Sequence, residues 1–266
     1  MAFSISKAAG WLHQVHRARA VVGWWPEQHA TKDERTAYRV QDALLKKLVP
    51  QQGPLVGYKI ALTSPQIWEQ TGLRGPAYGP IRRRRVFEHK ATVRADRWAR
   101  LGVELEIILT VNADVPKPKG KGYDRKSIAP YVGGARAGFE LIDDRGADYG
   151  RLTVPWLIMD VGWNGGSLLA KPNAKWRDLD LGNLDGSISF DGKVVRTGNS
   201  GDVLGHCYNA LAWLANKLGA HGKTLKKGMI VSTGSMVACQ FVPPGSTAVG
   251  RIAGLGEVTL KYELPR

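Results

Sequence analysis

The sequence predicts an α+β protein with a strand-rich body and a few long helices. Alternation of apolar and polar residues, the period of a strand, recurs at 55–64, 101–112, 186–198 and 250–263. Helical spacing of apolar residues is clearest at 31–50 and 201–222. Helices and strands do not alternate along the chain and no repeat is present, so a doubly wound sheet is not expected.

Length and composition fit one globular protein. The chain has 266 residues, of which 43% are apolar, enough for one large core. No stretch approaches the roughly 18 consecutive apolar residues of a membrane span, and the first residues lack the apolar run of a signal peptide. The two cysteines, Cys207 and Cys239, are too few for a disulfide framework or a thiolate zinc site. We expect a cytoplasmic protein with reduced thiols and no membrane partner.

The first half should contain helices followed by a long strand. Its expected elements are helices over 6–20 and 31–50, a strand over 55–64, a short helix through 66–73 and a strand over 101–112. Thr31 and Glu34 have capping-box spacing, and Pro50 should end the second helix. Ser64 and Pro65 should cap and begin the short helix.

The second half should be richer in strands. Its expected elements are a helix passing into a strand within 129–145, a hairpin over 186–198, a helix over 201–222, and strands over 226–235 and 250–263. Asp191 and Gly192 form the turn of the hairpin. Asp202 can cap the helix. His206 and His221 are expected at helix ends.

A net charge of +15 raises the possibility of a nucleic-acid-binding protein. Basic residues cluster in "IRRRRVFEHK" at 81–90 and in "KPKGKGYDRK" at 117–126. The second cluster is typical of a solvated loop. The run from Arg82 to Arg85 could hold an anionic substrate, line an oligomer contact or grip phosphates. Because no helix-turn-helix or zinc-finger pattern is present, nucleic-acid binding is the less favoured alternative.

Two glutamates fall on one face of the strand predicted at 101–112. Residues i and i+2 lie roughly 7 Å apart along a strand, so ionised Glu104 and Glu106 repel unless water or a cation screens them. The pattern alone favours a solvated surface, because Glu is rarely buried without a partner. A cation site is the alternative.

A lysine and a third glutamate add to this set. Lys59 shares its strand face with small residues, which leaves room for a ligand, although an exposed lysine on an edge strand explains the pattern equally well. Glu140 lies inside an apolar run, which a surface turn does not readily explain. Three carboxylates without Cys or His would favour Mg²⁺ or Mn²⁺ over zinc.

Five segments occur in an order that is specific to one family. They are "GYKIALTS", "VELEIIL", "FELIDDR", "VLGHCYNALAWLANKLGAHGKTLKKGMIVSTGSM" and "GLGEVTLKYE". Together they resemble the 2-keto-4-pentenoate hydratase and 2-oxo-3-hexenedioate decarboxylase branch of the fumarylacetoacetate hydrolase superfamily. The resemblance implies a mixed β-sandwich or roll with outer helices, a smaller N-terminal section at 1–80, a catalytic domain at 81–266, and a homo-oligomer.

The resemblance also implies a set of site residues. By position, Glu104, Glu106 and Glu140 would bind Mg²⁺ or Mn²⁺, and Lys59 would be the catalytic lysine beside a small anionic 2-oxo acid. The positions implied for substrate binding are Thr63, Ser64, Arg82, Asn164 and Ser235.

The implied activity is that of a lyase in aromatic catabolism, a hydratase of the 2-keto-4-pentenoate type. Hydratases of this branch usually carry Asp where this chain has Ala77, whereas the decarboxylases have an apolar residue there. The family's Asp-Asn pair is also absent, and Asp160 and Asn164 lie in a glycine-rich loop instead. A 2-oxo-3-hexenedioate-type decarboxylase is therefore the first alternative, followed by an acylpyruvate hydrolase. The arginine run suggests a more anionic substrate.

Overall fold

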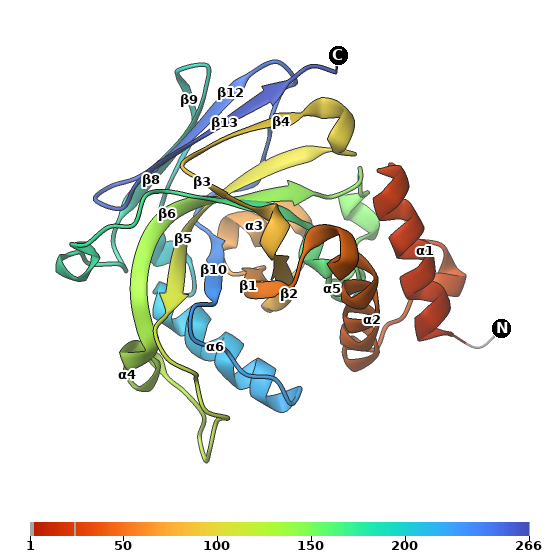
Figure 1. Cartoon of the computed structure of the whole chain (residues 1–266), viewed down its shortest axis with the longest axis horizontal. Coiled ribbons are helices and arrows are strands. Elements are labelled where there is room, and N and C mark those ends of the chain that lie inside the picture. Colours follow the sequence, from red (N-terminus) through yellow and green to blue (C-terminus); the bar gives the residue numbers. More distant parts are fainter. Residues whose placement is uncertain (1–2, 24, 266) are drawn as a thin grey trace.

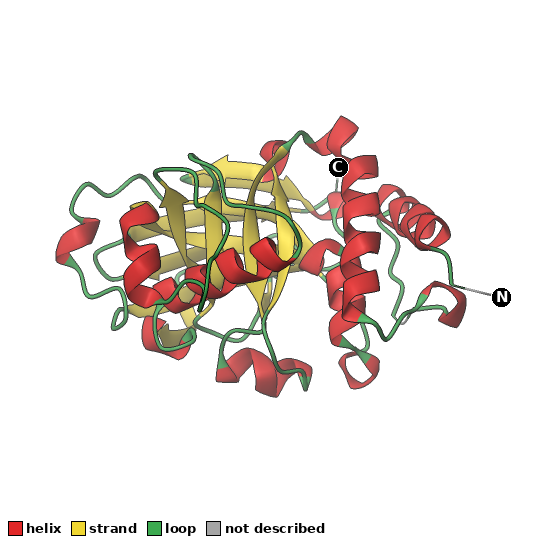
Figure 2. Ribbon diagram, turned by 90° about the horizontal axis from the view of Figure 1, so that it is seen from below, coloured by secondary structure: helices red, strands yellow, loops and turns green. Residues whose placement is uncertain are grey.

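Two mixed β-sheets form the centre of the protein, and helices lie around them (Figure 1, Figure 2). The computed structural model describes residues 3–23 and 25–265. Several neighbouring strands are antiparallel, but three pairs are parallel: β1 with β10, β3 with β7 and β4 with β13. The predicted α+β class is confirmed. The predicted division at residue 80 remains a prediction.

The elements have the following bounds. The helices are α1 Ile5–Ala18, α2 Glu34–Gln52, α3 Pro65–Thr71, α4 Arg125–Ile128, α5 Val154–Met159 and α6 Cys207–Ala220. The strands are β1 Leu55–Ala61, β2 Ala77–Arg82, β3 Val86–Glu88, β4 Lys90–Arg94, β5 Leu101–Val111, β6 Val132–Asp143, β7 Asn164–Leu169, β8 Asp185–Phe190, β9 Lys193–Asn199, β10 Ile230–Ser235, β11 Gln240–Phe241, β12 Thr247–Ile252 and β13 Gly256–Glu263. Short 3₁₀ turns join several of them, and η6 Val161–Trp163 matters for the site.

The larger sheet has the order β2-β1-β10-β5-β6-β7-β3, with β11 paired to β5, and the smaller has the order β4-β13-β12-β8-β9. Strands β5 and β6 pair along nearly their whole length, from Leu101 opposite Asp143 to Val111 opposite Val132. These two long strands lie at the centre of the larger sheet. Their continuous pairing fixes the positions of the residues on them.

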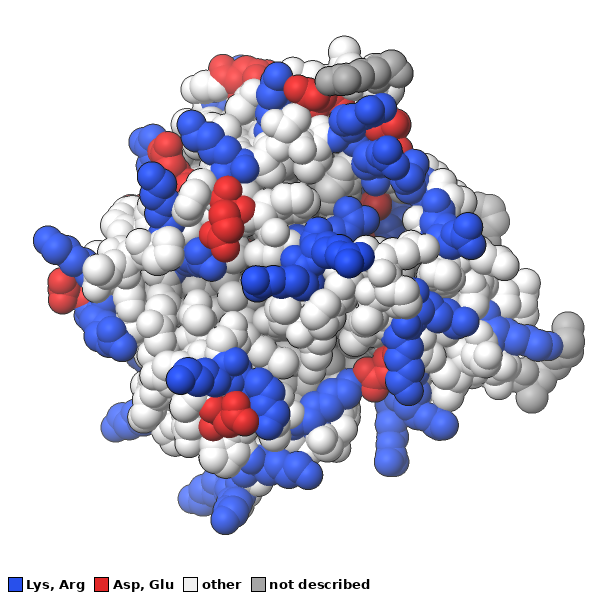
Figure 3. All heavy atoms as spheres, in the orientation of Figure 1, with Lys and Arg blue, Asp and Glu red and all other residues white. Residues whose placement is uncertain are grey.

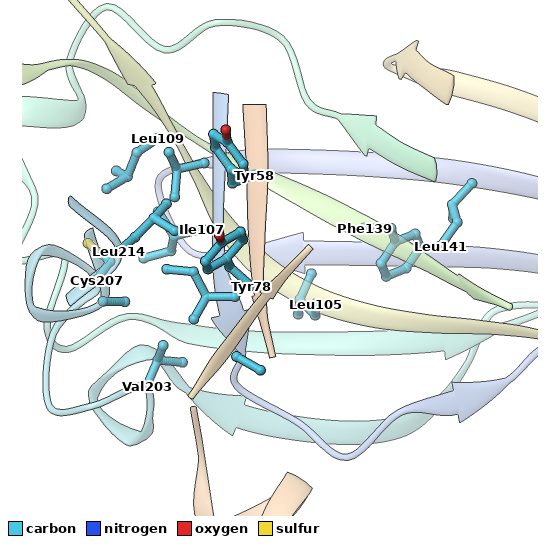
Figure 4. Packing of buried hydrophobic residues seen from close by; sticks show 14 of the residues in the cluster. Tyr58, Tyr78, Leu105, Ile107, Leu109, Phe139, Leu141, Val203, Cys207 and Leu214 are labelled. Atoms are coloured by element: carbon cyan, nitrogen blue, oxygen red, sulfur yellow. The ribbon is translucent and has the colours of Figure 1, made fainter. Parts of the chain in front are cut away.

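The core fills both sides of the central strand β5. Leu105 lies near Phe139 and Leu141, while Ile107 and Leu109 lie toward helix α6 (Figure 4). On the opposite face of β5, Ile108 packs in a separate buried cluster. The expectation that one face of this strand would be solvated is therefore wrong, because other elements cover both faces.

Several predicted boundaries need correction. The stretch 129–145 is not a helix leading into a strand, because 132–143 pairs as one strand with both β5 and β7. Pro50 does not end α2 but lies in its last turn. Asp33 caps α2, since its side chain accepts a hydrogen bond from the Thr36 amide at 2.7 Å. Asp202 does not cap α6 and instead accepts from the Gln66 side chain at 2.6 Å.

Other expectations hold. The hairpin between β8 and β9 turns at Asp191 and Gly192, both at positive φ. His206 and His221 are the N-cap and C-cap residues of α6. Cys207 and Cys239 are buried free thiols. Among the described residues, every helix is too short or too polar to cross a membrane.

Candidate metal centre and active site

Three glutamates converge on one face of the larger sheet. Glu104 on β5 lies directly opposite Glu140 on β6, and Glu106 follows two residues along β5. Each offers a carboxylate oxygen, and these oxygens all lie within 4.8 Å of one another. Like charges in directly opposed positions destabilise a sheet, so the arrangement requires a compensating positive charge. The structure thus brings together the three predicted metal ligands.

Hydrogen bonds orient two of these carboxylates through one oxygen each. One oxygen of Glu106 accepts from the Gly234 amide at 2.8 Å. One oxygen of Glu140 accepts from the Asn164 side-chain amide, also at 2.8 Å. Both glutamates are fully buried; the second oxygen of Glu106 accepts no hydrogen bond from the described residues, and that of Glu140 lies 3.2 Å from the Nζ of Lys59. Buried oxygens of this kind are suited to coordinating a cation.

Burial and crowding change the acidity of the cluster. Burial raises the pKa of Glu104 to about 7, where the charge of Glu140 adds to the effect and that of Lys59 opposes it. Burial, Glu140 and Glu104 raise the pKa of Glu106 well above its usual value. Without a cation, the three acids therefore cannot all be ionised easily at neutral pH.

Lys59 supplies one positive charge beside this cluster. It lies on β1, its side chain is 2% exposed, and its Nζ is 3.2 Å from the Oε2 of Glu140. Burial alone would lower the pKa of Lys59, but the negative charges of Glu140, Glu104 and Glu106 raise it. The lysine is therefore an ammonium ion. One such charge cannot neutralise three carboxylates.

A cavity with an empty volume of about 430 Å³ opens beside Lys59 and Glu104. Away from those two residues its walls are mostly apolar or aromatic. The apolar and aromatic wall residues are Ile60, Ala61, Leu62, Ile67, Ile142, Tyr149, Leu157 and Trp163. No arginine lines this cavity among the described residues, and Lys59 is the cation that faces it. The cavity thus combines two charged side chains with a mostly apolar and aromatic wall.

The residues predicted for substrate binding fall in several places. Ser235 lines the cavity, and its hydroxyl donates to the Val237 carbonyl at 2.7 Å. Thr63 and Ser64 are buried, and their hydroxyls have no partner among the described residues. Thr63 lies against Gly234, whose amide binds Glu106. Their roles in substrate binding remain predictions.

The other two predicted residues do not line the cavity but are hydrogen-bonded to residues of the site or to each other. Asn164 binds Glu140 and thereby orients a candidate metal ligand. Arg82 is buried outside the cavity and donates to the Asn164 carbonyl at 2.6 Å and to the Gln52 side chain at 3.0 Å. Burial, together with Arg85 and Arg145, lowers the pKa of Arg82 to about 9. A direct substrate contact by either residue remains a prediction.

A strained turn forms the wall facing Lys59. In η6, Val161, Gly162 and Trp163 all have positive φ, at 49°, 64° and 59°. This left-handed region is unfavourable for a β-branched residue such as valine, and strain of this kind is often found at functional sites. The turn approaches β2 so closely that a Cβ on Gly79 would lie 2.2 Å from the Val161 carbonyl oxygen.

A buried polar cluster anchors the start of this turn. Asp160 Oδ1 is 2.6 Å from His16 Nε2, and Asp160 Oδ2 is 3.0 Å from the Nε of Arg145. Burial alone would raise the pKa of Asp160, but Arg145 and His16 lower it. Helix α1, which carries His16, is thereby tied to the wall of the active-site cavity.

Sequence reasoning missed the aromatic wall and this anchoring cluster. Tyr149 and Trp163 stack with their ring centroids 5.8 Å apart. They come from loops on either side of α5, and no spacing rule in the sequence links such residues to β1 or β5. Asp160 was noted only as part of a glycine-rich loop, and its partner His16 lies 144 positions away.

Known proteins resemble this chain over nearly its whole length. No family model matches the chain. The 2-keto-4-pentenoate hydratase of Paraburkholderia phymatum is 27% identical over 258 residues, covering 97% of each chain. A 4-oxalocrotonate decarboxylase of Pseudomonas putida is 26% identical, covering 94% of this chain and 91% of its own. The chain is similar over nearly its whole length to proteins named as hydratases and decarboxylases of this kind. The resemblance found in the sequence is therefore confirmed.

The fold of these relatives is confirmed as well. The structure of 4-oxalocrotonate decarboxylase from Pseudomonas putida G7, solved with magnesium and adipate, superposes with a TM-score of 0.87 at 22% identity and covers 97% of both chains. The mixed-sheet fold with outer helices predicted from the sequence is thus the observed one.

The carboxylates of this chain fit a divalent metal on their own chemistry. The donors are oxygens only, which suits Mg²⁺ or Mn²⁺ better than a soft ion. Oε1 of Glu106 accepts no hydrogen bond from the described residues, and Oε2 of Glu140 lies beside the Lys59 ammonium. With Glu104, the three glutamates place one carboxylate oxygen each within 4.8 Å of the others, which meets the need for several oxygen ligands at one point. Asn164 and Gly234 fix the orientation of two of these ligands, as second-sphere groups do at metal sites.

Proposed function

We propose that this protein is a divalent-metal-dependent lyase that hydrates a small 2-hydroxydienoic acid, as a hydratase of the 2-keto-4-pentenoate type. The observation that carries the proposal is the convergence of Glu104, Glu106 and Glu140 beside the buried ammonium group of Lys59. Relatives named as hydratases that match over nearly the whole chain support it. Location in the cytoplasm and assembly into a homo-oligomer are part of the proposal.

The charged residues of the cavity suit the head of a 2-oxo acid. Glu104, Glu106 and Glu140 would hold Mg²⁺ or Mn²⁺, which supplies electrophilic stabilisation for negative charge that develops on the substrate oxygens. The Nζ of Lys59 can donate hydrogen bonds to the same anionic oxygens and can hold or release a proton there. Asn164 keeps Glu140 in place while this happens.

The apolar wall residues suit an uncharged substrate tail. Walls such as Leu157 and Trp163 exclude water and offer no positive charge to a second carboxylate. Arg82 was predicted to bind a more anionic substrate, but its guanidinium donates hydrogen bonds to acceptors within the protein. The lining therefore favours a monocarboxylic dienoate over a dicarboxylic one.

Decarboxylation is the second candidate, because one residue favours it. Ala77 at the start of β2 is buried and has no acid or base group where hydratases of this branch usually carry Asp. Addition of water needs a group that positions or activates the water, whereas departure of CO₂ needs mainly stabilisation of the negative charge left behind. The two reactions can therefore share this site.

The first experiment offers the purified protein 2-hydroxypenta-2,4-dienoate and 2-oxo-3-hexenedioate, each with Mn²⁺ and after removal of metal, and follows the products by mass spectrometry. We expect gain of one water on the dienoate in the presence of metal. Loss of CO₂ from the dicarboxylate would instead assign a decarboxylase. If neither compound changes, the proposed substrate class is wrong.

A substitution at one ligand tests the metal site. We expect Glu106→Gln to lower Mn²⁺-dependent turnover by about 100-fold or more, because it removes one of three carboxylate ligands. Glu69→Gln changes an exposed glutamate on α3 and serves as the matched control. Equal turnover by the two variants would exclude Glu106 as a ligand.

A further inference from the structure

The arginine run of the sequence lines a second cavity, distinct from the active-site cavity. This basic groove has an empty volume of about 810 Å³ and lies between the end of α1, the end of α2 and the turn η2 Arg83–Arg85. The residues of the basic groove that matter here are His16, Arg17, Arg19, Gln52, Arg84 and Arg85. It shares no lining residue with the cavity beside Lys59.

The basic groove concentrates positive charge without a carboxylate. No Asp or Glu lines it among the described residues. The guanidinium of Arg84 donates to the carbonyls of Pro50 and Gln51, at 3.3 and 3.2 Å, and that of Arg19 to the Asp96 carbonyl at 3.1 Å. These neutral acceptors orient the arginines and leave their charge in place.

Other arginines of the described chain are handled differently. Arg94, Arg100, Arg136 and Arg251 each form an ion pair with a carboxylate. Lys and Arg outnumber Asp and Glu over the whole face seen in Figure 3. General solubility explains scattered charges of this kind but not the convergence of four arginines in one concavity.

Burial and neighbouring positive charges both disfavour the charged form of Arg85. Its guanidinium is partly buried, with its Cζ 5.9 Å from the centre of the Trp98 ring. Burial and the charges of Arg145 and Arg19 lower the pKa of Arg85, despite the opposing influence of Asp143. A bound anion would relieve this repulsion.

We propose that the basic groove binds a multiply charged oxyanion of the pyrophosphate or phosphate-ester class, at a site separate from the metal centre. Guanidinium groups present paired N–H donors that match phosphate oxygens, and several of them in one cavity select for more than one negative charge. Gln52, whose side-chain oxygen accepts from Arg82 at 3.0 Å, lies at the base of the same groove.

A small anion fits better than a nucleic acid. A strand of nucleic acid would follow a line of exposed charges and would use Arg83 as readily as its neighbours. Arg83 is exposed but does not line the basic groove. This difference within a single run of arginines supplies the control for the test.

The test is isothermal titration with pyrophosphate, at fixed ionic strength, on protein freed of divalent metal by dialysis, since pyrophosphate chelates such metals. We expect saturable binding to one site. The double substitution Arg17→Gln, Arg84→Gln should weaken it by about tenfold or more, because each arginine makes charge-assisted hydrogen bonds. Arg83→Gln should change it less than about twofold, since only screened long-range charge is lost.

Arg17→Gln alone keeps the test valid if the double variant does not fold. Arg17 is exposed, and its side chain makes no hydrogen bond or ion pair with the residues that the structure describes. We expect this variant to melt as the wild type does and to bind pyrophosphate several-fold more weakly.

Three results would overturn the proposal. The first is a lack of saturable binding of pyrophosphate and of inorganic phosphate to the wild type. The second is an equal loss of binding in Arg83→Gln. The third is binding of a single-stranded oligonucleotide in place of pyrophosphate, with affinity that falls steeply with salt and depends on Arg83.

Discussion

Gly162 shows how a single residue connects backbone conformation to the active site. It is the middle residue of the left-handed turn η6, with φ of 64°, and a Cβ placed on it would lie 3.1 Å from the Cδ of Lys59. Both facts favour glycine: the first concerns backbone strain and the second concerns the space beside Lys59.

We expect Gly162→Ala to lower the free energy of unfolding by about 1 to 2 kcal/mol, because alanine is strained at this φ. It should also lower kcat/KM by about tenfold, since the new methyl group displaces Lys59. Urea unfolding and steady-state kinetics with Mn²⁺ measure the two effects. Gly192→Ala is the matched control, as Gly192 has φ of 82° with nothing within 4 Å of its added Cβ. If both variants lose the same activity, the contact with Lys59 does not matter.

The sequence predicted much of the site at this scale. The carboxylates of Glu104, Glu106 and Glu140 meet because strand periodicity puts two on one face and the register of β5 with β6 brings the third opposite. Periodicity alone favoured a solvated face, and only family resemblance favoured metal. The contact of Asn164 with Glu140 could not be predicted, because it depends on where a distant loop returns to the sheet.

At the scale of elements, one ionisable group ties helix α1 to the active-site wall. His16 lies on α1 with its Nε2 2.6 Å from Asp160 and 2.8 Å from Arg145. Burial and the charge of Arg145 lower the pKa of His16 to about 4, against the opposing effect of Asp160. In the folded protein the ring is therefore neutral at pH 7 and resists protonation.

This lowered pKa makes stability depend on pH in a defined direction. Between about pH 6.5 and pH 4 the unfolded chain binds a proton at His16 that the folded protein does not. The free energy of unfolding should therefore fall by up to about 3 kcal/mol as the pH drops through this window, and above it His16 should have no effect. Denaturant unfolding of wild type and His16→Gln at several pH values measures this. An equally steep decline in both proteins would contradict the role of His16.

Elements were predictable where local signals agree with the tertiary structure. The hairpin turn at Asp191 and Gly192 is set by local backbone chemistry and was predicted correctly. The helix expected before Phe139 was wrong, because the glycines and alanines of β6 allow close pairing with two neighbouring strands. Likewise Asp202 has capping chemistry but is used in a contact with Gln66.

Over the whole molecule, strand β6 belongs to both the core and the candidate metal centre. Its alternation directs Phe139 toward the smaller sheet and Glu140 toward the carboxylate cluster. The Phe139 ring is fully buried and packs so closely on β12 that a Cβ on Gly250 would lie 2.3 Å from it (Figure 4). Contact between the two sheets and placement of a metal ligand therefore depend on adjacent residues of one strand.

We expect Phe139→Ala to lower the free energy of unfolding by about 3 to 5 kcal/mol, because it leaves a cavity between sheets whose backbones cannot readily close it. Phe139→Leu, which keeps most of the volume, should lose less than about 1.5 kcal/mol. Urea unfolding measures both, and titration with Mn²⁺ should show unchanged affinity in the leucine variant, since Glu140 faces the opposite side. A loss below about 1 kcal/mol for alanine would mean that the sheets do not rely on this ring. Weakened Mn²⁺ binding with intact stability would mean instead that packing at Phe139 positions Glu140.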